Sequence, residues 1–138
     1  SRVYTDIKGN IKLDDITDAF IWYKHYDNPE TDLTPYVAMI FTIEGGAYDG
    51  GQLQLIQWNT WGQGYNYDWT KFDQDSWHYL VYDSDGNYIE HVGMPFGVTL
   101  AQVQTAYDGR LYKAAAAIGL AGGDDTADVL VDHLTITI

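Results

Sequence analysis

The stretch Tyr36-Val-Ala-Met-Ile-Phe-Thr-Ile-Glu44 decides the fold. Its alternate residues are apolar and share one face: Val37, Met39, Phe41 and Ile43. A period of two is that of a β-strand with one side in the core. Gly45-Gly46 and Gly50-Gly51 then flank a short segment around Tyr48-Asp49, which is typical of a tight turn. We therefore expect a buried strand that is followed by a turn.

Similar short strand-like stretches recur at 3–7, 11–13, 19–26, 52–61, 77–82, 87–92, 113–121 and 127–138. Asp85-Gly86 between two of them is a hairpin signal. Residues 62–76 form a loop rich in Gly, Asn, Asp and Tyr, and residues 99–107 could be a short helix. Many short strands without regular strand–helix alternation predict an all-β fold. We expect a β-sandwich or jelly roll of two antiparallel sheets, in one domain over residues 1–138.

The chain is strongly acidic, with 20 acidic and 7 basic side chains and a formal net charge of −13. Such a surface repels phosphate backbones, so we expect no nucleic-acid partner. No basic amphipathic stretch or long apolar run indicates a membrane partner. The sequence has no Cys and begins at Ser1 without Met or a signal peptide, which suggests a piece of a longer protein.

The residue types that usually carry catalysis are scarce or scattered. Ser1, Ser76 and Ser84 lie in no Gly-x-Ser-x-Gly motif, and the four histidines form no His-Glu-x-x-His pair. Two carboxylates could still flank a glycosidic bond, but the sequence favours no particular pair. We expect a protein that is not an enzyme, with a small glycan-active enzyme as an alternative.

The strongest functional signal is an aromatic block between Gln52 and Trp77. It contains four of the five tryptophans, namely Trp58, Trp61, Trp69 and Trp77. Gln, Asn and Asp side chains are interleaved with the rings. A pyranose stacks its apolar C–H face on an aromatic ring, and its hydroxyls need planar donors and acceptors. The block therefore predicts a site for a sugar chain.

The strand period divides this block between two faces. If Leu53 and Leu55 point into the core, Gln52, Gln54 and Trp58 lie on the outer face. We expect Trp77 and Trp22 to be core residues, since both lie within strands. The binding candidates are Trp58, Trp61, Trp69, Gln52 and Gln54, with Tyr65 and Tyr67 in support from a loop that contains Gly62 and Gly64.

Two acidic segments raise the question of calcium. Asp83-Ser-Asp-Gly-Asn87 resembles the start of a calcium loop, but its twelfth position is Met94 instead of Glu, which favours a hairpin turn. Asp128 and Asp132 share one face of a strand with apolar neighbours, so an Asp there needs a cation or backbone donors. Both a structural calcium and a hydrogen-bonded Asp stay open at this point.

The C-terminal part of the chain carries a resemblance to a known class. Lys113-Ala-Ala-Ala-Ala-Ile-Gly-Leu-Ala-Gly-Gly123 and Thr126-Ala-Asp-Val-Leu-Val-Asp-His-Leu-Thr-Ile136 resemble the ending of many β-jelly-roll carbohydrate-binding modules. The resemblance implies a secreted, extracellular module attached to a glycoside hydrolase or cellulosomal enzyme. It also implies that Asp132 contacts a structural calcium, with no other cofactor required.

The residues and the resemblance together predict a non-catalytic module that binds plant cell-wall polysaccharide. Because amide and carboxylate side chains accompany the rings, we expect a cleft rather than a flat face. The expected ligand is a β-glucan or a hemicellulose such as xyloglucan, mixed-linkage glucan or glucomannan. A protein-binding or adhesive β-sandwich is the alternative from another class, and it predicts a contiguous apolar patch.

Overall fold

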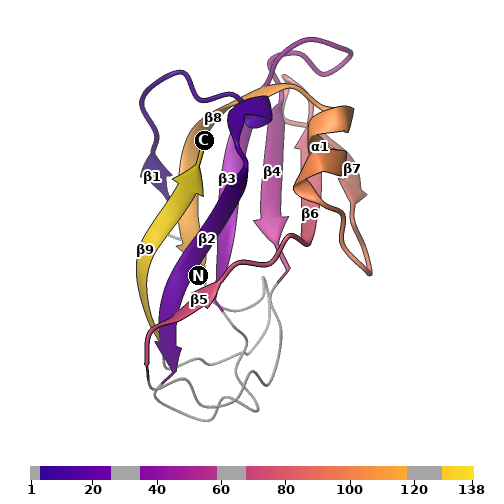
Figure 1. The fold of residues 1–138 in the computed structure, drawn as a ribbon. Helices are drawn as coiled ribbons and strands as arrows, with labels where there is room; N and C mark the ends of the chain where they lie inside the picture. Colours follow the sequence, from indigo (N-terminus) through magenta and orange to yellow (C-terminus); the bar gives the residue numbers. More distant parts are fainter. Residues whose placement is uncertain (1–3, 26–34, 59–67, 118–128) are drawn as a thin grey trace.

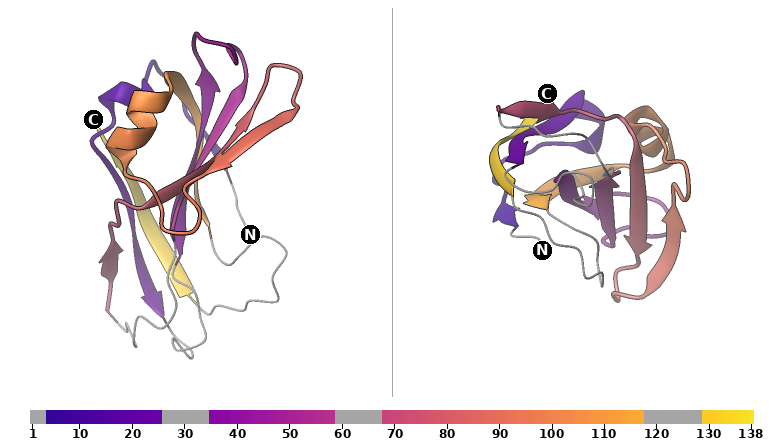
Figure 2. Two further views of the ribbon diagram at one scale, coloured as in Figure 1. Left: turned by 90° about the vertical axis from the view of Figure 1, so that its right-hand side faces the viewer. Right: turned by 90° about the horizontal axis from the view of Figure 1, so that it is seen from below.

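The structure of the protein is a computed structural model that describes residues 4–25, 35–58, 68–117 and 129–138. The side chains of His25 and of residues 129–133 lie outside that description. Within these ranges the strands form two antiparallel sheets, which face each other in the sandwich shown in Figures 1 and 2. The expected all-β sandwich of two antiparallel sheets is confirmed, whereas a jelly-roll connectivity stays a prediction.

The larger sheet has six strands, which are, in spatial order, β1 (Thr5–Asp6), β8 (Gly109–Ala117), β3 (Tyr36–Ile43), β4 (Gln52–Gln57), β6 (Trp77–Tyr82) and β7 (Tyr88–Val92). The smaller sheet has three strands, β5 (Thr70–Phe72), β2 (Asp18–His25) and β9 (Val129–Thr137). A short 3-10 turn, η1 (Leu13–Asp15), and the helix α1 (Leu100–Ala106) lie near one end of the sandwich (Figure 1). The strand order brings residues far apart in sequence side by side.

The core lies between the two sheets and follows the expected alternation. On β3 the inward residues are fully or almost fully buried, as are Leu53 and Leu55 on β4. Trp77 of β6 is a core residue with 2% exposure, as predicted. The smaller sheet contributes Ile21 and Tyr23 from β2. Burial of this continuous apolar cluster is the main driving force for the sandwich.

One polar side chain, Gln57, is fully buried in this core. Its Oε1 atom accepts a 3.0 Å hydrogen bond from the backbone N–H of Val37, and its Nε2 atom donates a 3.1 Å bond to the carbonyl oxygen of Gln74. A buried amide is tolerated because both of its polar ends have backbone partners. Gln57 therefore connects the start of β3 to the segment that precedes β6.

Residues 99–107 do form a short helix. The side chain of Thr99 accepts from the backbone N–H of Gln102, and the side chain of Gln102 returns to the backbone N–H of Thr99. This reciprocal capping box satisfies two backbone donors at the N-terminus of α1. Leu100 and Val103 then bury one side of the helix against the core.

Several sequence expectations differ from the structure. The strand expected at 113–121 is β8, which begins four residues earlier, at Gly109. Residues 11–13 were expected to be a strand, but only Lys12 forms an isolated bridge before η1 begins. The loop expected at 62–76 contains the strand β5. Trp22 is half-buried on the outer face of the smaller sheet and is not a core residue, because Ala19, Ile21 and Tyr23 take the inward positions of β2.

Candidate functional site

The clearest candidate site is a groove on the outer face of the six-stranded sheet. It encloses about 520 Å³. The residues that line it come from β3, β4, β6, β8 and two turns: Thr42, Gly50, Gly51, Gln52, Gln54, Tyr82, Asp83, Ser84, Gly86 and Tyr112. Gln52 and Gln54 are thus on the outward face of β4, where the period of the strand places them. We call this site the glutamine groove.

A directed row of hydrogen bonds crosses the floor of the glutamine groove. The Nε2 atom of Gln54 donates a 2.7 Å bond to Oε1 of Gln52, and Nε2 of Gln52 donates a 2.6 Å bond to the hydroxyl of Tyr112. Each amide nitrogen carries two N–H donors, and these contacts use one of them. The row therefore holds both amides in fixed orientations and leaves a second N–H on each to serve a ligand.

A β-bulge places Tyr112 in this row. In the pairing of β3 with β8, Phe41 lies opposite Leu111 and Ile40 lies opposite Lys113, so Tyr112 is the extra residue. A bulge interrupts the strict alternation of a strand and changes the direction of its side chains. Two residues, Tyr112 and Lys113, therefore lie between the buried positions Leu111 and Ala114, and Tyr112 reaches the outer face.

Two turns form the rim of the glutamine groove. The carboxylate of Asp83 accepts 2.9 Å hydrogen bonds from the backbone N–H groups of Asp85 and Asn87. These bonds lower the pKa of Asp83, and the bond from the backbone N–H of Asn87 has the largest effect. The lowered pKa keeps the carboxylate charged. Asp83 thus caps the turn between the antiparallel strands β6 and β7, and the hairpin predicted for 83–87 is confirmed. On the opposite turn a Cβ at Gly51 would lie 2.2 Å from the carbonyl oxygen of Tyr82, so only glycine fits.

Aromatic rings continue from the groove toward the sheet edge. Tyr82 and Tyr88 form an edge-to-face pair with ring centroids 6.1 Å apart, and Tyr88 is 58% exposed. An edge-to-face pair restrains both rings. Tyr82 is therefore a pre-oriented ring next to the amides of Gln52 and Gln54.

Trp58 lies past the other end of β4 in a small cluster of rings. Its indole N–H donates a 3.3 Å bond to the carbonyl oxygen of Gly93, and its ring centroid lies 4.7 Å from that of His78. A Cβ at Gly97 would lie 2.7 Å from the indole Cδ1 atom, so the turn after β7 packs closely on the ring. Trp58 is half-buried and does not line the glutamine groove.

The structure places Trp69 on the other side of the sandwich. It precedes β5 of the smaller sheet, and its ring lies under the ammonium group of Lys24 at 4.9 Å from the ring centroid. Trp69 is 41% exposed, so it is open to solvent but on a different face from Gln52 and Gln54. The remaining ring candidates, Trp61, Tyr65 and Tyr67, lie outside the described residues.

The proposed calcium ligands are described only in part. Asp128 lies outside the described residues, and only the backbone of Asp132 is described, in β9 opposite Trp22. Among the residues whose side chains are described, no group of three or more His, Asp or Glu side chains is arranged to hold a metal ion. Calcium at Asp132 and Asp128 therefore stays a prediction.

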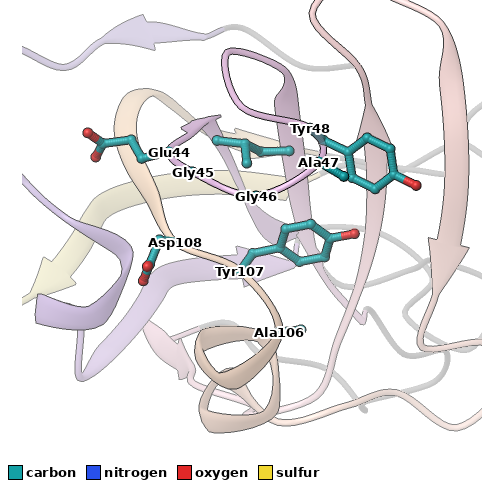
Figure 3. A pocket seen from close by; sticks show the side chains of 9 residues that line it. Glu44, Gly45, Gly46, Ala47, Tyr48, Ala106, Tyr107 and Asp108 are labelled. Carbon is teal, nitrogen blue, oxygen red and sulfur yellow. The ribbon is translucent and has the colours of Figure 1, made fainter.

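A second pocket, of about 390 Å³, lies between the β3–β4 turn and the end of α1 (Figure 3). Tyr48 and Tyr107 point to one side of it, and Glu44 and Asp108 lie on the other side. Two of the polar side chains there, Glu44 and Tyr107, already have protein partners. Glu44 binds Lys12 through one oxygen and Arg110 through the other, at 3.2 and 3.3 Å, and the hydroxyl of Tyr107 donates to Glu90 at 2.5 Å. This pocket is the weaker candidate.

Sequence reasoning identified part of the glutamine groove and missed the rest. Gln52 and Gln54 were found because they alternate with Leu53 and Leu55. Tyr112 and Tyr82 were missed because they lie on other strands, at positions where neither a tryptophan cluster nor an amide run marks them. In the structure buried and half-buried residues alternate from Trp77 to Tyr82, so a strand with Trp77 in the core places Tyr82, five residues later, on the outer face.

No family model, curated protein or solved structure matched this chain in the three comparisons that were made. Within the described ranges, none of the helical segments is long and apolar enough to pass through a bilayer. The functional assignment therefore depends on the geometry of the site.

Proposed function

We propose that this protein is a non-catalytic module that binds a neutral plant cell-wall polysaccharide in the glutamine groove. The observation that carries the proposal is the row from Gln54 through Gln52 to Tyr112, which lies beside the ring of Tyr82 in an open groove. Hydroxyl groups of a sugar chain need donors and acceptors at fixed positions, and the apolar face of a pyranose needs a ring. Both are present on one surface.

The ordered amides favour binding over a flexible surface of the same composition. Ordering a long side chain on binding costs about 0.5–1.5 kcal/mol. In the glutamine groove Gln52 and Gln54 are already held by hydrogen bonds, and Tyr82 is held by its contact with Tyr88. A rigid site of this kind fits the repeated, weak contacts by which β-glucan or hemicellulose chains are held.

The negative charge of the protein favours a neutral polysaccharide over an acidic one. The chain carries a formal net charge of −13, and Asp83 at the rim of the groove stays ionised. An acidic polysaccharide is repelled by such a surface, whereas xyloglucan, mixed-linkage glucan and glucomannan are not. Secretion, and the targeting of an appended glycoside hydrolase to its substrate, belong to the same proposal.

Affinity electrophoresis tests the proposal. The protein is run through native gels that contain xyloglucan, mixed-linkage glucan or glucomannan, and we expect at least one of them to retard it. Tyr82→Ala and Gln54→Ala should remove that retardation while circular dichroism stays unchanged. Tyr48→Ala, in the second pocket, is the matched control and should bind normally. Retardation that is lost in the control but kept in the other two variants would place the site elsewhere.

A reducing-sugar assay tests the non-catalytic part. We expect no release of reducing ends from any glycan that binds, and release above a heat-denatured control would contradict that part of the proposal.

A protein-binding role is the second candidate, and one observation favours it. The turn after β7 exposes two large apolar side chains, Phe96 at 91% and Met94 at 57%. The turn is held by hydrogen bonds in both directions between Trp77 and Val98 at 2.8 Å. Phe96→Ser should leave glycan retardation unchanged if the glutamine groove is the binding site. Loss of glycan retardation in this variant alone would place the glycan-binding site at the turn and not in the glutamine groove.

A further inference from the structure

The helix α1 closes the sandwich along one edge. It lies beside β6 and β7 (Figure 1) and buries Leu100 and Val103 in the core between the sheets. The side chain of Gln104 ties the helix to the chain that leads into β2, because its Nε2 atom donates 2.8 Å bonds to the carbonyl oxygens of Leu13 and Ile16. The helix therefore contacts both sheets and fills the gap between them at this edge.

The opposite edge, formed by β1, β8 and β9, contains a pocket in that place. The pocket encloses about 360 Å³. It is lined by residues from both sheets and from the segment after β1: Thr5, Ile7, Ile11, Leu111, Ala114, Leu134 and Ile136. We call it the edge pocket. Leu111 and Ala114 are buried, whereas the other four aliphatic side chains are only half-buried.

The strand β9 presents inward-facing side chains to the edge pocket. Ile136 lies opposite Ala19 in the pairing of β9 with β2, and Ala19 is buried in the core. Residues directly opposite each other in an antiparallel pair share one face of the sheet. Leu134, two residues earlier, packs against the same core. Both side chains therefore leave apolar surface in contact with water, and a ligand that covers this surface gains free energy.

The lining selects for an uncharged ligand. The seven lining residues, all of them described, bring six aliphatic side chains and one hydroxyl, without a charged group or an aromatic ring. A charged group loses its hydration in such a pocket and finds no partner there. The formal net charge of −13 repels anions in addition.

The volume limits the size of the ligand. An apolar cavity of about 150 Å³ stays dry and holds one benzene ring. By the same measure the edge pocket, at about 360 Å³, has room for about two or three rings. Pockets that hold small molecules in proteins start at about 300 Å³ and have a mainly apolar lining with a few polar groups. Both conditions are met here, with the hydroxyl of Thr5 as the polar group.

We propose that the edge pocket binds a small, neutral, apolar molecule of two or three rings, a property separate from the proposed binding of polysaccharide. The ligand fills the space between the sheets at this edge, as Leu100 and Val103 fill it at the other.

Two dyes with one skeleton test the proposal. N-phenyl-1-naphthylamine is neutral, and 8-anilino-1-naphthalenesulfonate has the same three rings with an added sulfonate. Both become fluorescent in an apolar site. We expect saturable binding of the neutral dye and at least about tenfold weaker binding of the sulfonate. In NMR spectra the neutral dye should shift the methyl signals of Leu134 and Ile136 but not those of Val103, at the α1 edge.

Two variants obstruct the edge pocket by different routes. Ile136→Glu adds a carboxylate to the lining, and Thr5→Trp fills the pocket from an exposed position. Each should weaken binding of N-phenyl-1-naphthylamine about tenfold or more. Phe96→Ser removes an exposed ring elsewhere on the molecule and is the matched control, which should bind the dye like the unchanged protein. Circular dichroism checks that each variant is folded, and Thr5→Trp decides the test if Ile136→Glu is not.

Four results would overturn the proposal. A folded Thr5→Trp protein that binds the neutral dye normally would place the dye elsewhere, and loss of dye binding in Phe96→Ser would place it at the turn after β7. Equal affinity for the two dyes would contradict a neutral ligand. A dimer in sedimentation experiments that binds no dye would make the edge pocket an interface between copies of the chain. Glycan retardation should stay unchanged in Thr5→Trp, so failure of the edge pocket and failure of the polysaccharide proposal are distinguishable.

Discussion

The side chain of Gln52 donates a 2.6 Å hydrogen bond to the hydroxyl of Tyr112, although β3 lies between their two strands. Neighbouring strands are about 4.8 Å apart, so the contact spans roughly 10 Å across the sheet. Only long side chains can close that distance, and the residue between them must be small. Thr42 pairs with Gln52 on one side and with Arg110 on the other, and it is exposed at this point. Thr42, a small side chain on the strand between them, lines the groove together with Gln52 and Tyr112 and leaves its floor open.

Filling that gap should abolish polysaccharide binding. Thr42→Trp places a large ring on the exposed floor between Gln52 and Tyr112, where it blocks the groove without entering the core. We expect loss of gel retardation and a change in unfolding free energy within about 0.5 kcal/mol, the usual range for surface substitutions. Thr42→Ser is the control and should behave like the unchanged protein. A Thr42→Trp protein that binds glycan normally would contradict the location of the site.

Removal of one hydroxyl should weaken binding without affecting the fold. Tyr112→Phe leaves the ring in place and removes the acceptor of the Gln52 amide. Because a Gln52 side chain released from Tyr112 must be ordered on binding, at a cost of about 0.5–1.5 kcal/mol, we expect the dissociation constant to rise about two- to tenfold. Isothermal titration calorimetry with a soluble oligosaccharide measures the change. The melting temperature should fall by no more than about 5 °C, since the lost hydrogen bond is only part-buried and contributes at most about 1 kcal/mol to folding.

Gln57 should be important for stability and not for binding. Gln57→Leu preserves much of the volume but leaves the N–H of Val37 and the carbonyl of Gln74 without their partner. An unsatisfied buried polar group costs about 1–3 kcal/mol, so we expect a loss of about 2–4 kcal/mol in urea unfolding. Gln54→Leu, on the outward face of the same strand, is the matched control. Equal losses in both variants would contradict the role assigned to the buried amide.

Asp18 should make stability depend on pH. Partial burial, followed by the hydrogen bond and the charge of Asp73, raises the pKa of Asp18 from 3.8 to about 6. The folded protein therefore binds this proton more tightly than the unfolded chain does. The stabilisation is complete below about pH 3.8, and it is lost as the pH rises through about 6.

Asp18→Asn removes this penalty and keeps the acceptor for the N–H of Ala19. We expect the variant to be more stable than the unchanged protein at pH 7 by about 1 kcal/mol, reduced from the full value because Asp18 is partly open to solvent. The difference should disappear near pH 4. Thermal unfolding from pH 4 to pH 7 measures this difference in unfolding free energy. An equal difference at pH 4 and pH 7 would contradict the role of the raised pKa of Asp18.

The alternation of apolar residues was enough to predict the sandwich and two of the ten residues that line the candidate groove, Gln52 and Gln54. Val37, Met39, Leu53 and Leu55 face the core in the structure because burial of apolar surface orients a whole strand at once. Once β4 is oriented, its outward residues Gln52 and Gln54 follow without any knowledge of other strands. A local pattern is sufficient for such positions, since their direction depends only on the strand that contains them.

Other positions were decided by the tertiary structure. The outward direction of Tyr112 depends on a bulge in β8, and its nearness to Gln52 depends on β3 lying between the two strands. Trp69 is close to Gln52 in sequence but belongs with the opposite sheet, since β5 pairs with β2. Strand order and register arise from long-range packing of the whole core, and no short stretch of sequence encodes them. The sequence by itself therefore determined which side chains of one strand face water, and the folded sheet determined which of those side chains meet.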